Sequence, residues 1–122
     1  MNRSKKVRNT KKSKRPPKTY AGKKNRLASQ LIPEALGLHK AGDLQQAEEL
    51  YLKAIELCHD HPDANHLLGA LWGQRGDDEK AILYMSRAVE AKPDFVDAHI
   101  NLANAHRRQR QYEEAIRCLE KA

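Results

Sequence analysis

The residues best suited to bind a metal ion lie in one short stretch of the chain, which contains Cys58, His59, His61 and His66. Thiolate and imidazole groups are common zinc ligands, and structural zinc sites usually present them as closely spaced pairs. The Cys-His-x-His-x4-His spacing lacks such pairs, and the stretch reads as a turn leading into a helix. We therefore interpret these side chains as surface histidines at a junction, and we expect no metal ion and no cofactor.

Other patterns that could support catalysis are absent from the sequence. The chain has no glycine-rich phosphate loop and no nucleophile-elbow motif. Its two cysteines, Cys58 and Cys118, are interpreted as reduced structural thiols of a cytoplasmic protein, although a reactive Cys58 stays open. These observations predict a chain that is not itself an enzyme.

The sequence repeats with a period of 34 residues, and this period indicates which elements must position any functional side chain. Ala47, Ala81 and Ala115 mark the repeat. The same offset relates the following sets of residues: Gly42-Asp43, Gly76-Asp77 and Arg110-Gln111; Tyr51, Met85 and Leu119; Ala54, Ala88 and Ala122. Self-similarity at this period is typical of stacked two-helix units, which offer a surface to partners.

The middle unit carries a recognisable signature. It reads Leu68-Gly69-x2-Trp72, followed by Gly76, Ala81, Met85, Ala88 and Pro93. This pattern resembles the tetratricopeptide repeat, and the resemblance covers residues 28–122. It implies an all-α, right-handed solenoid of about three units, at about 28–61, 62–95 and 96–122, with the last unit truncated.

Two runs show a narrower resemblance. Residues 61–69 and 95–105 are similar to the amino-terminal repeats of bacterial tetratricopeptide glycosyltransferases related to the O-linked N-acetylglucosamine transferases. In that family the repeats recruit substrates and a separate domain transfers the sugar. The chain contains no such domain, so the resemblance implies at most a substrate-recruiting fragment and assigns no catalytic residue.

The repeat pattern predicts six helices, at 28–41, 44–58, 63–75, 78–91, 95–109 and 112–122, and no strand. We expect Pro33 in the first turn of the first helix and Asp94 as the N-cap of the fifth. Ala122 matches positions inside a second helix, and no capping helix follows it. We therefore expect either a fragment of a longer protein or an end covered by a partner, with self-association through this helix as one possibility.

The resemblance places the first helix of each unit on the concave face of the array. The residues that it assigns to a peptide-binding groove are His66, Gln74, Asn101, Asn104, Arg107 and Arg108. Asparagine amides offer both a donor and an acceptor to a peptide backbone, and Arg108 offers a charge-assisted bond to a carboxylate. An ordinary solvated helix face is an equally good interpretation, since Leu67 occupies the place that matches Asn101.

Charge divides the chain into two parts. Of the 23 basic residues, 12 lie in residues 1–26, whereas all 16 acidic residues lie beyond them. The first 26 residues are also poor in apolar side chains, which predicts a disordered basic arm ahead of a repeat domain at 27–122. The arm is either a solvated tail or a weak contact to nucleic acid or another anionic surface. The sequence contains no secretory signal and no transmembrane segment.

Together these features predict a non-catalytic module that binds a protein or peptide partner in its groove. Two alternatives stay open: the recruiting part of a longer glycosyltransferase, and a tether to nucleic acid or the ribosome through the basic arm.

Overall fold

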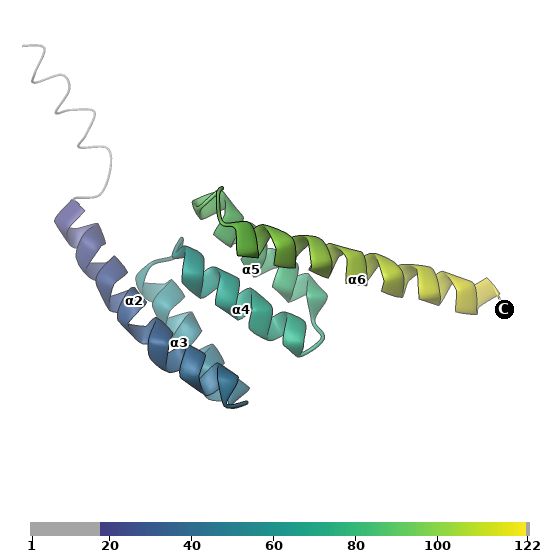
Figure 1. The fold of residues 1–122 in the computed structure, drawn as a ribbon, viewed down its shortest axis with the longest axis horizontal. Coiled ribbons are helices and arrows are strands. Elements are labelled where there is room, and N and C mark those ends of the chain that lie inside the picture. The colour runs from purple at the N-terminus through teal and green to yellow at the C-terminus, as the bar shows by residue number, and fades with distance from the viewer. Residues whose placement is uncertain (1–17, 122) are drawn as a thin grey trace, which may run out of the picture.

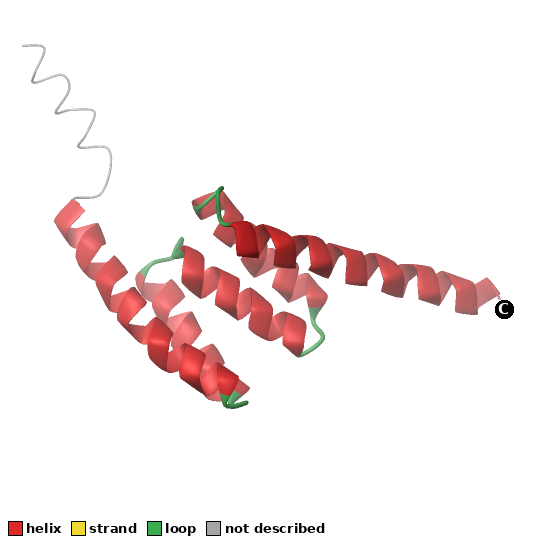
Figure 2. Cartoon of the chain, viewed as in Figure 1, coloured by secondary structure: helices red, strands yellow, loops and turns green. Residues whose placement is uncertain are grey.

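The computed structural model describes residues 18–121, with the backbone alone for residues 18–21 and 121. This part of the chain folds into helices joined by short turns and contains no strand (Figures 1 and 2). The helices are α2 (Lys18–Lys40), α3 (Leu44–Leu57), α4 (Pro62–Gln74), α5 (Asp78–Ala91) and α6 (Val96–Lys121). Within these residues, no helix is long and apolar enough to cross a membrane.

The helices form a linear array rather than a closed bundle. Each helix packs against the next one along the chain, and α4 also contacts both α2 and α6. The first helices of successive units therefore lie side by side, with α3 and α5 behind them (Figure 1). This arrangement confirms the predicted all-α solenoid.

Small residues at the repeat positions bring the helices close together. Ala47, Ala54, Ala81 and Ala88 are all fully buried. At the close contact between α4 and α5, a Cβ atom on Gly69 would lie 2.7 Å from Met85 Cγ and 3.1 Å from the Ala81 carbonyl oxygen. The predicted register of the middle unit is therefore correct, because only glycine fits at this position without displacing α5.

The turns inside the first two units are built in the same way. Gly42 and Gly76 have φ angles of 91° and 90°, a region that side-chain-bearing residues rarely adopt. The next residue in each turn, Asp43 or Asp77, caps the following helix by accepting a hydrogen bond from a main-chain N–H three residues on. Each unit therefore reverses direction through a glycine followed by an aspartate.

The third unit lacks this turn, and the prediction of separate helices at 95–109 and 112–122 is wrong. Helix α6 is continuous over Val96–Lys121. The positions that match the glycine and the aspartate carry Arg110 and Gln111. Arginine disfavours a positive φ, and glutamine is not among the preferred N-caps, whereas both are good helix formers. The chain therefore continues as a helix where the other units turn.

Helix α2 also differs from the prediction. It begins at Lys18, directly after the Pro16-Pro17 pair in the sequence, so part of the predicted basic arm is helical. Pro33 lies in the interior of this helix and not in its first turn. The rest of the predicted arm, residues 1–17, lies outside the described residues. Helix α2 packs on α3 through the fully buried Ala28 and Ala35.

The junction before α6 departs from the predicted Asp94 cap as well. Helix α6 begins at Val96, and the Phe95 carbonyl accepts the bond from His99 N–H, so Asp94 precedes the cap position. The His99 side chain instead donates from Nε2 to the Pro93 carbonyl at 2.8 Å, which holds the turn. Pro62 is the first residue of α4, where its missing N–H costs little.

Candidate functional site

A hollow of about 380 Å³ lies on the face formed by α4 and α6. The residues that line it are Ala70, Gly73, Gln74, Met85, Asn101, Asn104 and Arg108. Four of the six predicted groove residues, Gln74, Asn101, Asn104 and Arg108, therefore lie together. The other two, His66 and Arg107, do not line the hollow but contact residues that do.

His66 orients Asn101. The Asn101 Nδ2 amide donates to His66 Nε2 at 2.9 Å, and the His66 ring packs edge-on against Phe95 with ring centroids 4.8 Å apart. Burial lowers the pKa of His66, while the nearby Asp97 and Asp63 carboxylates act in the opposite direction. A neutral imidazole accepting at Nε2 fixes the amide so that Asn101 presents a defined edge to the hollow.

Arg108 is already paired, in contrast to the prediction that it is solvated and available. Its Nε and Nη2 both donate to Asp78 Oδ1, at 3.1 Å and 2.9 Å. The Asp78 side chain is only 8% exposed and the Arg108 side chain is 45% exposed. Gly73 provides the room, since a Cβ atom there would lie 3.3 Å from Arg108 Nη2. Arg108 therefore joins α6 to the start of α5.

Arg107 and Asn104 form a second pair on the same helix, in which an Arg107 Nη2 group donates to Asn104 Oδ1. The two residues are three apart, which places them on neighbouring positions of one helical face. Arg107 is exposed, whereas Asn104 is half-buried at the wall of the hollow. The interaction therefore holds the Asn104 amide and leaves a positive charge at the rim.

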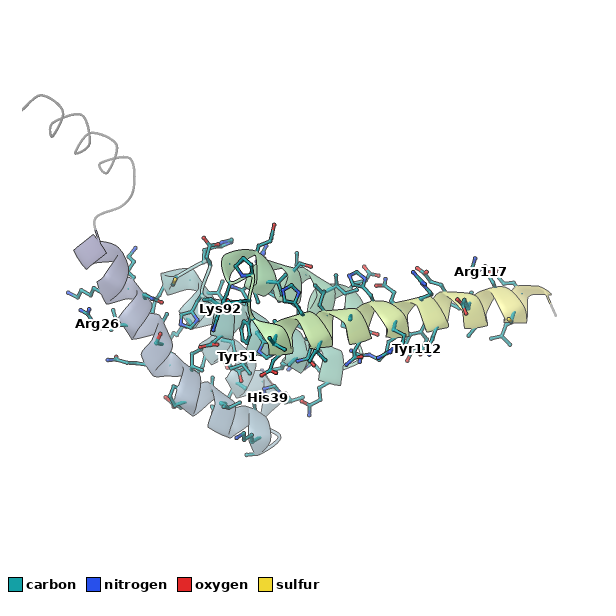
Figure 3. The ribbon with its side chains drawn as sticks, turned by 45° about the horizontal axis from the view of Figure 1, so that its top comes forward. Arg26, His39, Tyr51, Lys92, Tyr112 and Arg117 are labelled. Carbon is teal, nitrogen blue, oxygen red and sulfur yellow. The ribbon has the colours of Figure 1, made fainter. Side chains whose placement is uncertain are left out.

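Gln74 is held from the first unit by a relay that the sequence did not reveal. His39 Nε2 donates to Gln74 Oε1 at 2.8 Å, and His39 Nδ1 accepts from the Tyr51 hydroxyl at 3.1 Å. Tyr51 is fully buried, and burial raises its pKa to about 12, so the hydroxyl keeps its proton and donates. Figure 3 shows His39 and Tyr51 close together. The only indication in the sequence was the large side chain of Tyr51, which matches Met85 and Leu119 in the repeat.

The histidines of the candidate metal cluster have separate structural roles. His61 is 4% exposed, so the prediction of a surface histidine is wrong for this residue. His61 is the N-cap of α4: Nδ1 accepts from Ala64 N–H at 3.2 Å, and Nε2 lies 2.9 Å from the Ser29 hydroxyl of α2. His59 is exposed beside Asp60. Within residues 18–121, no group of three or more His, Cys, Asp or Glu side chains has a geometry that could hold a metal ion.

The same junction contains a buried asparagine and a cysteine. Asn65 is fully buried, and its Nδ2 donates to the main-chain carbonyls of His59 and His61 at 3.0 Å and 2.9 Å, which closes the turn. Cys58 is half-buried, and burial raises the pKa of its thiol, with the Asp60 carboxylate adding to this and the Asp60 main-chain hydrogen bond opposing it. The raised pKa disfavours the reactive thiolate form.

The pKa of His61 predicts a stability that falls in acid. Burial lowers this pKa below its ordinary value of 6.5, although the Asp63 charge opposes the shift. The unfolded chain therefore binds more protons than the folded chain below about pH 6.5. The free energy of unfolding should be highest above this pH and should decrease as the pH drops through the lowered pKa, because a protonated Nδ1 cannot accept from Ala64 N–H.

Urea unfolding at pH 7.5 and pH 5 measures this effect. His61→Asn is the matched variant, since asparagine keeps an N-cap acceptor and does not titrate. We expect the variant to lose less stability between the two pH values than the wild type does. An equal loss in both proteins would assign the pH dependence to other groups, of which His66 is the first to examine.

Comparison with known proteins agrees with this architecture. Two sequence profiles described as tetratricopeptide repeat match the chain, one over residues 38–61 and 62–95 and the other over residues 96–122. An uncharacterized protein of Methanocaldococcus jannaschii is 34% identical over 76 residues, which are 62% of this chain and 71% of that protein.

Solved structures show the same fold. The MamA protein superimposes with a TM-score of 0.65 and 23% sequence identity. The superposition covers 77% of this chain and 51% of the MamA chain. The TPR2B domain of yeast Sti1, solved as a complex with pHsp70, gives a TM-score of 0.65 and 22% identity over 76% of this chain and 74% of that domain.

The paired helices and the face lined by first helices define the class of protein, an α-helical repeat array with a side-chain-lined groove. The profile matches, which together cover residues 38–122, then identify the family: the chain belongs to the tetratricopeptide repeat family.

Proposed function

We propose that the chain is a docking module that binds an extended segment of a partner protein in the hollow between α4 and α6. The observation that carries this proposal is the set of amide side chains, Gln74, Asn101 and Asn104, that line the hollow. Each amide offers both a donor and an acceptor, as a peptide backbone requires. The complex of the Sti1 domain with pHsp70 supports the proposal, because a domain of the same fold binds a protein segment.

The amides are held before a ligand arrives, which favours binding. Asn101 is fixed by His66, Asn104 by Arg107 and Gln74 by His39. Side chains that are already ordered lose less conformational entropy on association. The exposed Arg107 adds a positive charge at the rim, which suits a carboxylate on the partner segment. Arg108 contributes less to such a contact, because Asp78 neutralises it.

Substitution of the groove amides tests the proposal. A peptide selected on the full chain from a displayed random library provides the ligand, and titration calorimetry measures its affinity. Asn104→Ala and Gln74→Ala should each weaken binding by about 0.5–2 kcal/mol through lost hydrogen bonds to the peptide backbone. Lys53→Ala is the matched control, since Lys53 is exposed on α3 and does not line the hollow. Wild-type affinity in both groove variants would exclude the hollow as the site.

The other functions suggested by the sequence remain proposals with narrower support. The runs at 61–69 and 95–105 favour the recruiting part of a longer glycosyltransferase, and the coding sequence beyond Ala122 decides that question. The basic residues of 1–26 favour a contact to an anionic surface, and a cytoplasmic location is proposed on the basis of the two unpaired cysteines.

A further inference from the structure

The face of α6 that packs on α5 continues beyond the end of α5. Ala105 is fully buried in an apolar cluster with Ala81 and Met85 of α5. Three residues further along α6, Arg108 bonds to Asp78, which is the first residue of α5. The rest of α6 therefore lies past the end of α5, and Figure 1 shows this half of the helix extending beyond the other helices.

An apolar stripe is exposed on this extension. Tyr112, Ile116 and Leu119 are 64%, 54% and 75% exposed. Tyr112 and Leu119 follow Ala105 at intervals of seven residues, and Ile116 lies one turn after Tyr112, so the stripe continues the packing face of α6. Figure 3 shows Tyr112 on this part of the helix. A surface of the type that α5 covers in the first half of α6 is therefore left open.

A cleft of about 470 Å³ lies between this extension and the turn that joins α4 to α5. Tyr112, Glu113 and Ile116 line the cleft from α6. Asp77 and Glu79 line it from the turn and from the start of α5. The cleft therefore combines apolar side chains with carboxylates, which favours a ligand that carries an apolar side chain between cations.

The cleft carries a net negative charge, because its other charged groups are already paired. Arg75 donates to Glu48 at 2.6 Å, and Asp78 is paired with Arg108. Among the side chains that the structure describes, the three remaining carboxylates of the cleft take part in no ion pair; they belong to Asp77, Glu79 and Glu113. A cationic segment in the cleft therefore meets three negative charges that no cation of this fold compensates.

We propose that the cleft binds the basic segment, residues 1–17, of a second copy of the chain, with residues 5–8 at its centre. The basic segment precedes the described residues and contains eight Lys or Arg and no acidic residue. Its residues 5–8 are Lys5-Lys6-Val7-Arg8, in which one apolar side chain stands between cations. Val7 packs on the apolar stripe, and its basic neighbours pair with the carboxylates of the cleft. This proposal is independent of peptide binding in the hollow.

The position of α2 favours a second copy over the same chain as the source of the basic segment. The bond from His39 to Gln74 shows that the carboxyl ends of α2 and α4 lie together, near the turn that borders the cleft. Helix α2 has 23 residues, so Lys18 lies roughly 35 Å from that end. Arg8 precedes Lys18 by ten residues, which reach at most about 33–36 Å when fully extended. A chain could therefore fill its own cleft only with this stretch completely extended, whereas a second copy has no such constraint.

Charge reversal on each side of the contact tests the proposal on the full chain. Lys6→Glu/Arg8→Glu alters the basic segment, and Glu79→Lys/Glu113→Lys alters the cleft. Sedimentation at low ionic strength should show a wild-type dimer, and each variant alone should dimerise at least about tenfold more weakly, because like charges then meet. The wild-type dimer should also weaken at high salt.

A mixture of the two variants gives the sharpest result. The cleft variant keeps a normal basic segment, and the segment variant keeps a normal cleft, so a mixed pair restores one contact that neither variant can make with itself. The mixed dimer should therefore form at least about tenfold more tightly than either variant alone. Glu49→Lys/Glu56→Lys is the matched control, since it makes the same change of charge at exposed positions of α3 outside the cleft and should dimerise like the wild type.

The segment variant keeps the proposal falsifiable if the cleft variant folds poorly, because its substitutions lie outside the described helices. A wild-type chain that sediments as a monomer at every soluble concentration would overturn the proposal. A dimer that persists in the segment variant would also overturn it and would assign the pairing to the apolar stripes of two copies. A mixture that dimerises no better than its components would assign the basic segment to its own chain or to another anionic partner, such as a nucleic acid. None of these results affects peptide binding in the hollow, because the groove variants are measured separately.

Discussion

Gly69→Leu is expected to destabilise the protein by about 1–3 kcal/mol or more, because it overpacks the closest helix contact in the middle unit. A single Cβ atom at this position already lies 2.7 Å from Met85 Cγ and 3.1 Å from a main-chain oxygen of Ala81. The Ala81 oxygen belongs to α5 and cannot move without shifting that helix. Gly69→Ala should therefore destabilise as well, by a smaller amount.

Thermal unfolding followed by circular dichroism measures the effect. For a domain of this size, each kcal/mol corresponds to about 4–8 °C in Tm. Gly37→Ala is the matched control: Gly37 lies in the interior of α2, and a Cβ atom there meets nothing within 4 Å. That substitution should raise the free energy of unfolding by about 0.5–1 kcal/mol, because alanine stabilises a helix interior more than glycine does. Equal melting temperatures for Gly69→Leu and the wild type would contradict the close packing of α4 on α5.

Arg108→Ala is expected to lower stability by about 1–3 kcal/mol, in contrast to the small effect that a solvated groove arginine would have. The Asp78 carboxylate is 8% exposed and accepts two side-chain hydrogen bonds from Arg108. Removal of the guanidinium leaves the buried Asp78 carboxylate without this partner. Because the Arg108 side chain is 45% exposed, the loss of stability should be smaller than for a fully buried pair.

A double-mutant cycle with Asp78→Asn separates this pairing from other effects of each substitution. The coupling free energy from urea unfolding should be about 0.5–3 kcal/mol and should decrease at high salt, because one partner is half-exposed. Arg108→Lys should retain only part of it, since a lysine ammonium does not reproduce the two guanidinium bonds that converge on Asp78 Oδ1. Additive losses in the double variant would show that the two side chains do not stabilise each other.

Most of the fold could be predicted from the sequence, because it depends on residues that pack or turn within a single repeat unit. Alanines at a 34-residue period, together with Gly42 and Gly76, predict close helices and tight turns, and these features are present. The continuous α6 could have been predicted by the same reasoning, because Arg110 and Gln111 lack the two properties that the turn requires. The sixth helix was predicted from the 34-residue period alone, without regard to the residue types at these two positions.

The site was less predictable because its side chains are paired between units. The bonds of His39 to Gln74, His66 to Asn101 and Asp78 to Arg108 join residues 35, 35 and 30 positions apart. Sequence periodicity places a residue on a helical face, but it does not show which neighbour that residue meets across the next unit. The sequence therefore indicated that Gln74, Asn101, Asn104 and Arg108 share one face, but it did not indicate the partners that fix the amides.

The position of α4 has a consequence for cooperativity. Among the described helices, α4 is the one whose contacts reach both the preceding first helix, α2, and the following one, α6. In an array held by neighbour contacts, the free energy of folding is a sum of local terms joined at each interface. Information about a ligand seated against α6 can thus reach the first unit mainly through α4, and the two ends of the array communicate through a single shared helix.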